Sequence, residues 1–182
     1  MKGLLRLLGI CFLTGGFVNA YAGGFVRFED IDGESVVEGY ENWSEFLSVV
    51  QEIVPAEAPS GVVTKVNQAP QFKEISVIKV LDKASPRIAQ LALRLQVIPR
   101  VEIEWTRNIN GVEQPYYTYR LTNAVVTEYS SKGFGNTDLD SATDGQIKEK
   151  ISLDFQEIRV RYYEYDEQGS LAGIVEYDWV NK

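Results

Sequence analysis

The chain has 182 residues, enough for one domain with its own hydrophobic core. It carries 18 Lys and Arg against 26 Asp and Glu, and the resulting net charge of −8 repels nucleic acid and anionic lipid. Histidine is absent and the one cysteine is Cys11, which excludes Ser-His-Asp and Cys-His catalysis and the usual zinc or copper sites.

Residues 1–22 have the pattern of a secretory signal peptide. Lys2 and Arg6 give a positive start, a short apolar stretch follows, and Ala20-Tyr21-Ala22 matches the small-x-small pattern at a cleavage site. The apolar stretch is shorter than the ~20 residues that a membrane span needs. We therefore expect cleavage after Ala22, with an uncleaved N-terminal anchor as the alternative.

Cleavage at this point would leave residues 23–182 as the exported domain, in the periplasm or outside the cell. That domain has no cysteine, so it forms no disulfide. Its net charge is −10, because Lys2 and Arg6 leave with the signal peptide and no acidic residue does. We expect no nucleic acid partner and no membrane insertion after cleavage.

The first half of the exported domain is predicted to be mostly strand. Residues 25–31 form an apolar strand that ends in the Asp30 to Gly33 turn. The apolar residues from Trp43 to Val54 fit either a helical face or a strand. Pro55 ends this segment, and residues 56–71 have the composition of a loop.

A strand-cap-helix junction follows near the middle of the chain. Residues 72–81 are rich in β-branched side chains and predict a strand. Beyond Asp82-Lys83-Ala84-Ser85-Pro86, apolar residues recur at the spacing of one helical face, which predicts a helix from Pro86 to about Val97. Ser85 is expected to be the N-cap of this helix, with Pro86 at the first helical position.

The next two strands form a hairpin. Val101, Ile103 and Trp105 alternate with polar residues, which predicts a half-buried strand. Asn110-Gly111 predicts the hairpin turn, since both residues tolerate positive φ. The returning strand is expected from Gln114 or Tyr116 to Tyr129, followed by a polar loop over residues 130–145.

The last part of the chain predicts a second hairpin. Apolar residues alternate from Ile151 to Phe155 and then in the opposite phase from Ile158 to Tyr162, so we expect a β-bulge at Gln156-Glu157. Asp166 to Gly169 predicts a turn, and residues 171–179 the final strand. About seven or eight strands and one helix indicate a mainly β fold, an antiparallel barrel or sandwich with one flanking α-helix.

The order and spacing of several segments resemble the Hcp (hemolysin-coregulated protein) family, and together these segments cover most of residues 25–179. They are Phe25-Val26-Arg27-Phe28-Glu29-Asp30-Ile31-Asp32-Gly33-Glu34-Ser35, Trp43 with the strand behind it, the junction Asp82 to Pro86, the strands around Asn110-Gly111, Ile151-Ser152-Leu153-Asp154-Phe155, Tyr162-Tyr163-Glu164-Tyr165-Asp166 and Tyr177-Asp178-Trp179.

The resemblance implies a compact β-barrel with one helix and a non-enzymatic, structural role. Its best known members form hexameric rings that stack into the inner tube of type VI secretion systems. The implied partners are further copies of the chain, with secretion-system components or cargo effectors as additional ones. The signal peptide departs from this family, whose tube proteins are normally made without one. An exported relative that kept the fold and lost the injection role is therefore a second interpretation.

Paired carboxylates are the remaining candidates for catalysis, because two of them suffice to cleave a glycoside. The candidate pairs are Glu102 with Glu104 and Asp154 with Glu157. Glu102 and Glu104 alternate with core residues, so both are expected on a solvated or subunit-contacting face. We therefore interpret the chain as a non-enzyme, assign no catalytic residue and expect no cofactor.

Two acidic segments resemble the start of a calcium loop. Asp138, Asp140 and Asp144 supply oxygen ligands, but Ala142 stands where another ligand belongs. Asp30 to Gly33 begins like such a loop but reaches its glycine too early. A solvated acidic loop is the simpler interpretation of both, so we assign no metal site.

Tyrosines gather in the predicted strands. They are Tyr116, Tyr117, Tyr119, Tyr129, Tyr162, Tyr163, Tyr165 and Tyr177. Aromatic strips can stack on sugars, and they also pack cores and subunit interfaces. The alternative function is therefore a secreted glycan- or protein-binding module, monomeric or loosely associated.

Overall fold

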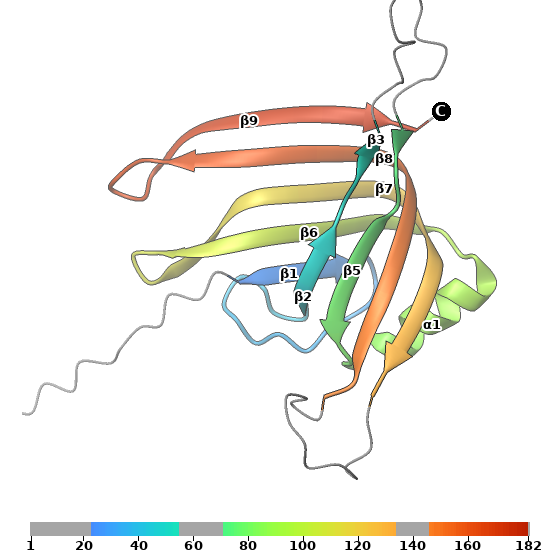
Figure 1. Cartoon of the computed structure of the whole chain (residues 1–182). Coiled ribbons are helices and arrows are strands. Elements are labelled where there is room, and N and C mark those ends of the chain that lie inside the picture. The colour runs from blue at the N-terminus through green and yellow to red at the C-terminus, as the bar shows by residue number, and fades with distance from the viewer. Residues whose placement is uncertain (1–22, 55–70, 134–145, 182) are drawn as a thin grey trace, which may run out of the picture.

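The computed structural model describes residues 23–54, 71–133 and 146–181, which form a β-barrel with one flanking helix (Figure 1). The elements are β1 (Gly24–Phe28), β2 (Ser44–Val50), β3 (Ile53–Val54), β4 (Gln71–Phe72), β5 (Ile75–Val80), α1 (Ser85–Arg94), β6 (Ile98–Ile109), β7 (Val112–Lys132), β8 (Lys148–Tyr165) and β9 (Leu171–Val180). Cys11 and the predicted signal peptide lie outside the described residues.

The main sheet has seven strands in the order β5-β2-β1-β6-β7-β8-β9, and β5 also pairs with β8. This pairing closes six antiparallel strands into a barrel and leaves β9 attached to β8 alone. The mainly β, helix-flanked fold predicted from the sequence is thereby confirmed. The ambiguous segment from Trp43 to Val54 is strand, because Val49 pairs with Val77 of β5 in the barrel wall.

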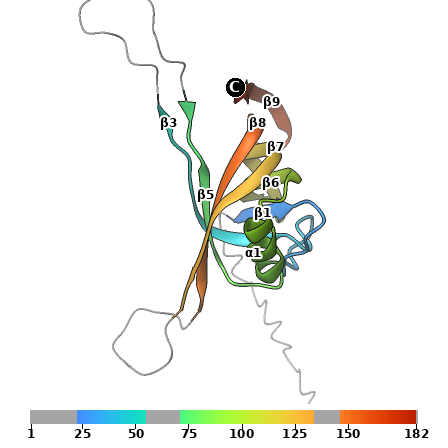
Figure 2. The ribbon, with the colours of Figure 1, turned by 90° about the vertical axis from the view of Figure 1, so that its right-hand side faces the viewer.

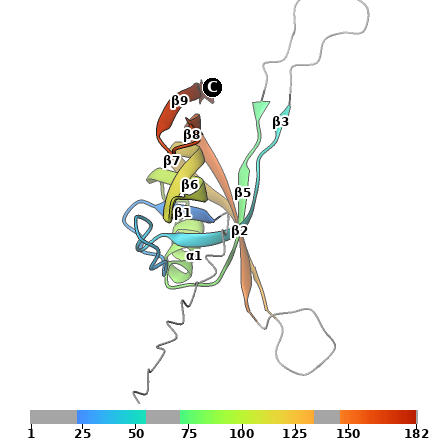
Figure 3. The ribbon, with the colours of Figure 1, turned by 90° about the vertical axis from the view of Figure 1, so that its left-hand side faces the viewer.

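The core lies inside the barrel and beneath α1. Ile88 and Leu91 of the helix are buried against barrel side chains that include Val101 and Leu121. Figure 1 shows the β6–β7 and β8–β9 hairpins extending beyond the barrel, at the opposite end of these long strands from α1. Figures 2 and 3 show β3 and the upper end of β5 on the side of the barrel away from the helix.

Both predicted hairpin turns are present. Asn110 and Gly111 have φ values of 54° and 88°, and Gly169 has a φ of 83°. Glycine favours these left-handed conformations because it has no Cβ. The strand that returns from the first turn is longer than predicted, since residues 130–132 continue β7 and pair with β8. Residues 55–70 and the predicted acidic loop, Asp138 to Asp144, lie outside the described residues.

The predicted end of the helix and the predicted bulge are wrong. The helix ends at Arg94 and not at Val97, because Leu95 turns into the left-handed region at φ 49°. No bulge lies at Gln156-Glu157, since the pairing of β7 with β8 keeps one register on both sides of Gln156. Both strands change phase together here, and Asn123, at φ 50°, donates a side-chain hydrogen bond to Gln156 at 2.7 Å.

Candidate assembly surface

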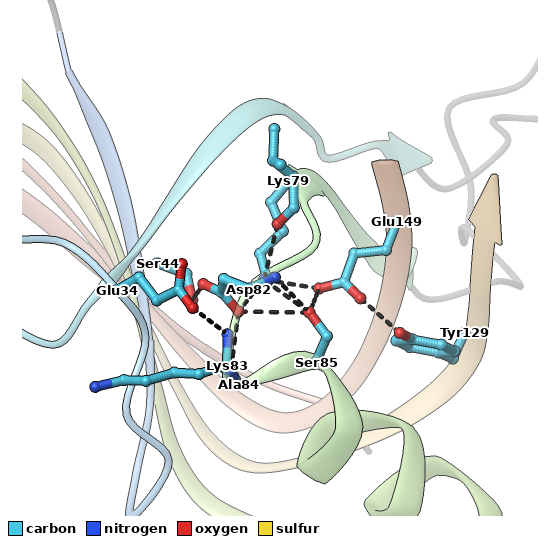
Figure 4. A network of polar contacts seen from close by, with 10 residues as sticks. Glu34, Ser44, Lys79, Asp82, Lys83, Ala84, Ser85, Tyr129 and Glu149 are labelled. Atoms are coloured by element: carbon cyan, nitrogen blue, oxygen red, sulfur yellow. Dashed lines mark hydrogen bonds and ion pairs between the residues drawn. The ribbon is translucent and has the colours of Figure 1, made fainter. Parts of the chain in front are cut away.

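A buried polar network occupies the strand-cap-helix junction (Figure 4). The Lys79 side chain on β5 has no exposed surface, and its Nζ lies 2.6 Å from Asp82 Oδ1 and 2.7 Å from Glu149 Oε1 on β8. The Tyr129 hydroxyl of β7 donates to the other oxygen of Glu149 at 2.6 Å, and the Ser44 hydroxyl of β2 donates to Asp82 at 2.6 Å. We call these residues, together with Ser85, the buried junction.

Ser85 is not the N-cap that the sequence predicted. It is the first residue of α1, and Ala84 precedes the helix without a side-chain cap. Asp82 Oδ1 accepts a hydrogen bond from the N–H of Ala84, the residue that precedes the helix, at 2.9 Å. The Ser85 hydroxyl instead accepts from the Asp82 N–H at 3.0 Å and donates to Glu149 at 2.8 Å.

The buried junction orders the fold and is shielded from substrates. Its partners come from β2, β5, β7, β8 and the start of α1, so it fixes the helix against the barrel wall. Burial, together with the hydrogen bond to Glu149, raises the pKa of Tyr129. The sequence held one signal for this network, because Lys79 and Glu149 share the alternation phase of the buried residues Val77 and Ile151.

Glu102 and Glu104 lie on the outer face of β6, as their alternation predicted, but Glu102 is not solvated. Its side chain is almost completely buried, and its two oxygens pair with Arg27 of β1 and Arg120 of β7. Glu104 accepts a hydrogen bond from the Tyr40 hydroxyl at 2.9 Å, and burial raises the pKa of this carboxyl. The hollow beside both residues holds about 20 Å³, too small for a sugar.

The structure also separates the second predicted carboxylate pair, Asp154 and Glu157. Asp154 lines a groove with Ser76 of β5, whereas Glu157 lies farther along β8 and is not part of that groove. In the part of the chain that the structure describes, no group of three or more Cys, Asp or Glu side chains could hold a metal ion. Of the two predicted carboxylate pairs, only Glu102 and Glu104 line a common hollow.

The outer face of the sheet carries a continuous row of charge. Arg27, Glu102, Arg120, Arg159 and Asp178 are directly opposite one another across β1, β6, β7, β8 and β9. Arg120 and Arg159 would repel as neighbours, and each has a carboxylate on its far side. A second ion pair joins Arg161 to Glu176 at 2.6 Å.

The opposite, core-side face of the sheet continues beyond the barrel as an aromatic strip. We define the inner strip as Trp105, Tyr117, Tyr162, Val175 and Tyr177, which lie on one face of β6 to β9. Trp105 and Tyr117 pack with ring centroids 5.5 Å apart. Tyr162, Val175 and Tyr177 are 43%, 69% and 44% exposed, so the outer part of the strip is uncovered in the single chain.

The predicted tyrosines therefore separate by role. Tyr119 is buried and Tyr129 belongs to the buried junction, while the rings of Tyr116 and Tyr165 both lie within about 6 Å of the Arg107 guanidinium. Tyr163 faces outward, opposite Ile174. Tyr117, Tyr162 and Tyr177 belong to the inner strip, and two of them, Tyr162 and Tyr177, are exposed.

Strand β9 is a free edge. It pairs with β8, and among the described residues nothing pairs with its other side. Edge strands are usually protected by charged side chains, lysine above all, by proline or by a short length. Strand β9 runs for ten residues without lysine or proline, and its two charged residues, Glu176 and Asp178, are paired with Arg161 and Arg159 of β8. Leu171, Ile174, Val175, Tyr177 and Val180 are all exposed on it. This edge and the inner strip form the candidate assembly surface.

These features define a class: a closed antiparallel barrel with one flanking helix and an unprotected edge strand. Residues 25–162 match the family described as type VI secretion system effector, Hcp, and the chain belongs to this family. The chain is similar to the "Major exported protein" of Pseudomonas aeruginosa, with 31% identity over 109 residues, which are 59% of this chain. The match spans about 60% of that curated relative's length.

Solved structures show the same fold. A type six secretion system protein superimposes with a TM-score of 0.75 at 22% identity, over 88% of this chain and 96% of its own. Hcp1 from Salmonella typhimurium gives a TM-score of 0.66 at 20% identity, over 88% of this chain and 95% of its own. A type VI secretion system effector from Yersinia pestis gives 0.66 at 16% identity, over 87% and 99%.

Within the described ranges, no helix has the length and hydropathy of a membrane span.

Proposed function

We propose that the chain is exported, loses residues 1–22 and assembles through β9 and the inner strip into closed rings, six subunits being the number that the family resemblance implies. The observation that carries the proposal is the ten-residue unprotected edge strand beside three exposed apolar residues of one strip. Such an edge pairs readily with another chain, and exposed aromatic residues are typical of interface cores.

A closed ring requires a heterologous interface, in which one patch contacts a different patch on the neighbour. The free edge of β9 supplies one such patch, because it can form backbone hydrogen bonds with a strand of the next subunit. Rings that stack on one another would give the tube of a type VI secretion system. The name of the Pseudomonas aeruginosa relative supports the export step.

The test is the molecular mass of the exported chain in solution, by size-exclusion light scattering and native mass spectrometry. We expect a hexamer at micromolar concentration. Val175→Lys places a charge on the exposed part of the strip and is expected to give smaller species. Val36→Lys is the matched control, since Val36 is 89% exposed and lies outside β9 and the strip. A wild-type monomer would contradict ring formation.

A monomeric wild-type chain would favour the second candidate, a secreted binding module. The exposed rings of Tyr162 and Tyr177 are the observation behind this candidate, because sugars stack on such faces. Glycan-array binding that is lost in Tyr162→Ala would support it.

A further inference from the structure

A small acidic hollow lies where the described chain begins. It has a volume of about 250 Å³ and is lined by Gly23, Gly24, Phe25, Val37, Glu45, Phe46 and Glu113. Two of these side chains, Glu45 and Glu113, are carboxylates, and none is basic. The hollow is therefore suited to a small cation that can also donate hydrogen bonds.

Two buried oxygen atoms lack partners here, one on the lining residue Glu113 and one on Thr106, which adjoins Gly23. Glu113 Oε1 accepts a long hydrogen bond from Asn108 at 3.3 Å, but its buried Oε2 has no partner among the described residues. Thr106 has no exposed surface, and its Oγ1 is likewise unpartnered. Buried polar atoms without partners cost about 1–3 kcal/mol each, so a missing donor is the physical explanation.

Both the hollow and the unpartnered hydroxyl adjoin Gly23. The Thr106 N–H donates to the Gly23 carbonyl at 2.9 Å, which fixes the backbone there. A Cβ on Gly23 would lie 2.7 Å from Thr106 Oγ1, and a Cβ on Gly24 would lie 2.4 Å from the Phe46 ring. A Cβ at either position would force a neighbouring side chain to shift, so the start of β1 packs closely against Thr106 and Phe46.

We propose that the missing donor is the α-ammonium group of Gly23, created when a signal peptidase hydrolyses the Ala22–Gly23 bond. Water supplies the hydroxyl that completes the Ala22 carboxyl group and the hydrogen that completes the Gly23 amine. At neutral pH the amine takes one more proton from solvent. This inference rests on the export step of the proposed function and adds to it a binding site for the new terminus.

The ammonium group fits the hollow chemically. It carries a positive charge and three N–H donors, whereas the peptide nitrogen of an unprocessed chain is neutral and carries one. A hydrogen bond between an ammonium group and a carboxylate is stronger than one between neutral groups. Processing would therefore stabilise the folded domain through Glu113 and Glu45 as well as remove the signal peptide.

The first measurement is the intact mass of the full chain after expression in an exporting bacterium. We expect the soluble product to begin at Gly23. A product that keeps residues 1–22 would overturn both the export step and this inference. A product that begins at another residue would overturn this inference alone, and ring formation, which is read separately from native mass, would be unaffected.

The second measurement is the pKa of the Gly23 amine, from competitive acylation of the exported product across a pH series. A free α-amino group has a pKa of about 7.7–8.0, and adjacent carboxylates should raise it by about one unit. Glu113→Gln should bring the pKa of the Gly23 amine most of the way back to its ordinary value. Glu74→Gln is the matched control, because Glu74 is exposed, precedes β5 and does not line the hollow, so it should leave the pKa unchanged.

Glu45→Gln provides a second variant if Glu113→Gln does not fold, and it should lower the amine pKa in the same direction. If Glu113 had only a structural role, Glu113→Gln would change the stability of the fold and leave the pKa of the Gly23 amine unchanged. An amine that titrates at the ordinary value in the wild-type product would overturn the inference even when cleavage occurs after Ala22.

Discussion

Lys79 and Glu149 form an ion pair of 2.7 Å in which neither side chain has any exposed surface. The next residue of β8, Lys150, forms an ion pair of the same length with Glu128, but this one is open to solvent. Two ion pairs of equal length therefore involve successive residues of β8 and differ in burial. The barrel thus contains its own comparison of a buried and an exposed ion pair.

Glu149→Gln should lower the free energy of unfolding by ~3–5 kcal/mol, because it leaves Lys79 buried with half of its counter-charge. Glu128→Gln should change it by less than ~1 kcal/mol, since exposed ion pairs contribute little. Urea unfolding at fixed protein concentration measures both. Equal effects of the two substitutions would show that the buried junction does not hold the helix to the barrel.

Gly33→Ala should destabilise the loop that carries Trp43. A Cβ on Gly33 would lie 2.3 Å from the Trp43 carbonyl oxygen, and this backbone atom cannot move aside as a flexible side chain could. We expect a loss of ~1–3 kcal/mol in unfolding free energy, the usual range for overpacking. The loss should appear in thermal unfolding and in altered Trp43 fluorescence.

Gly173→Ala is the control for this prediction. The nearest atom to its added Cβ would be the Glu164 carboxylate at 3.5 Å, an ordinary contact. It should therefore unfold like the wild type.

Local signals in the sequence predicted the elements that local physics determines. The turn at Asn110-Gly111 follows from the tolerance of both residues for positive φ, and the strand through Val101 and Ile103 follows from alternation. The family resemblance and the strand count together predict the barrel. No single pattern in the sequence predicts it.

The interior electrostatics could not be predicted in this way. The alternation along β6 predicts Glu102 on a solvated or subunit-contacting face, yet Arg27 and Arg120 reach it from two neighbouring strands and cover it. The sequence around Ser85 predicts an N-cap. In the structure the Ser85 hydroxyl instead donates a hydrogen bond to the carboxylate of Glu149, 64 residues farther along the chain. Such contacts depend on which strands become neighbours, and propensity at one position carries no information about that.

Glu104 should make the fold less stable as the pH rises through the titration of its carboxyl. Burial, the largest cause, raises the pKa of Glu104 above its ordinary value, while the hydrogen bond from Tyr40 lowers it. Between the ordinary glutamate pKa of the unfolded chain and the raised Glu104 pKa of the folded chain, the folded state binds more protons than the unfolded state. The free energy of unfolding therefore falls as the pH rises through this window.

Replacing Glu104 with glutamine removes the charge that burial disfavours and keeps an acceptor for Tyr40. Glu104→Gln should therefore equal or exceed the wild type in stability at pH 7, and its advantage should shrink below the ordinary glutamate pKa.

Tyr40→Phe should raise the Glu104 pKa further, because the hydrogen bond that lowers it is lost. Carbon-13 NMR titration of the glutamate carboxyls measures this directly, and an unshifted or lowered Glu104 would contradict the account.

The two faces of β9 should differ in their effect on assembly. Val175 lies on the inner strip, opposite Tyr162, whereas Ile174 lies on the charged outer face, opposite Tyr163. Both are well exposed, at 69% and 47%, so a lysine at either position leaves the core intact.

If the strip contacts the neighbouring subunit, Val175→Lys should dissociate the ring and Ile174→Lys should not, because the new charge would be desolvated only in the first case. Native mass spectrometry of the two variants distinguishes the faces. Dissociation by Ile174→Lys alone would place the interface on the charged face, and intact rings in both variants would remove both side-chain faces of β9 from the interface.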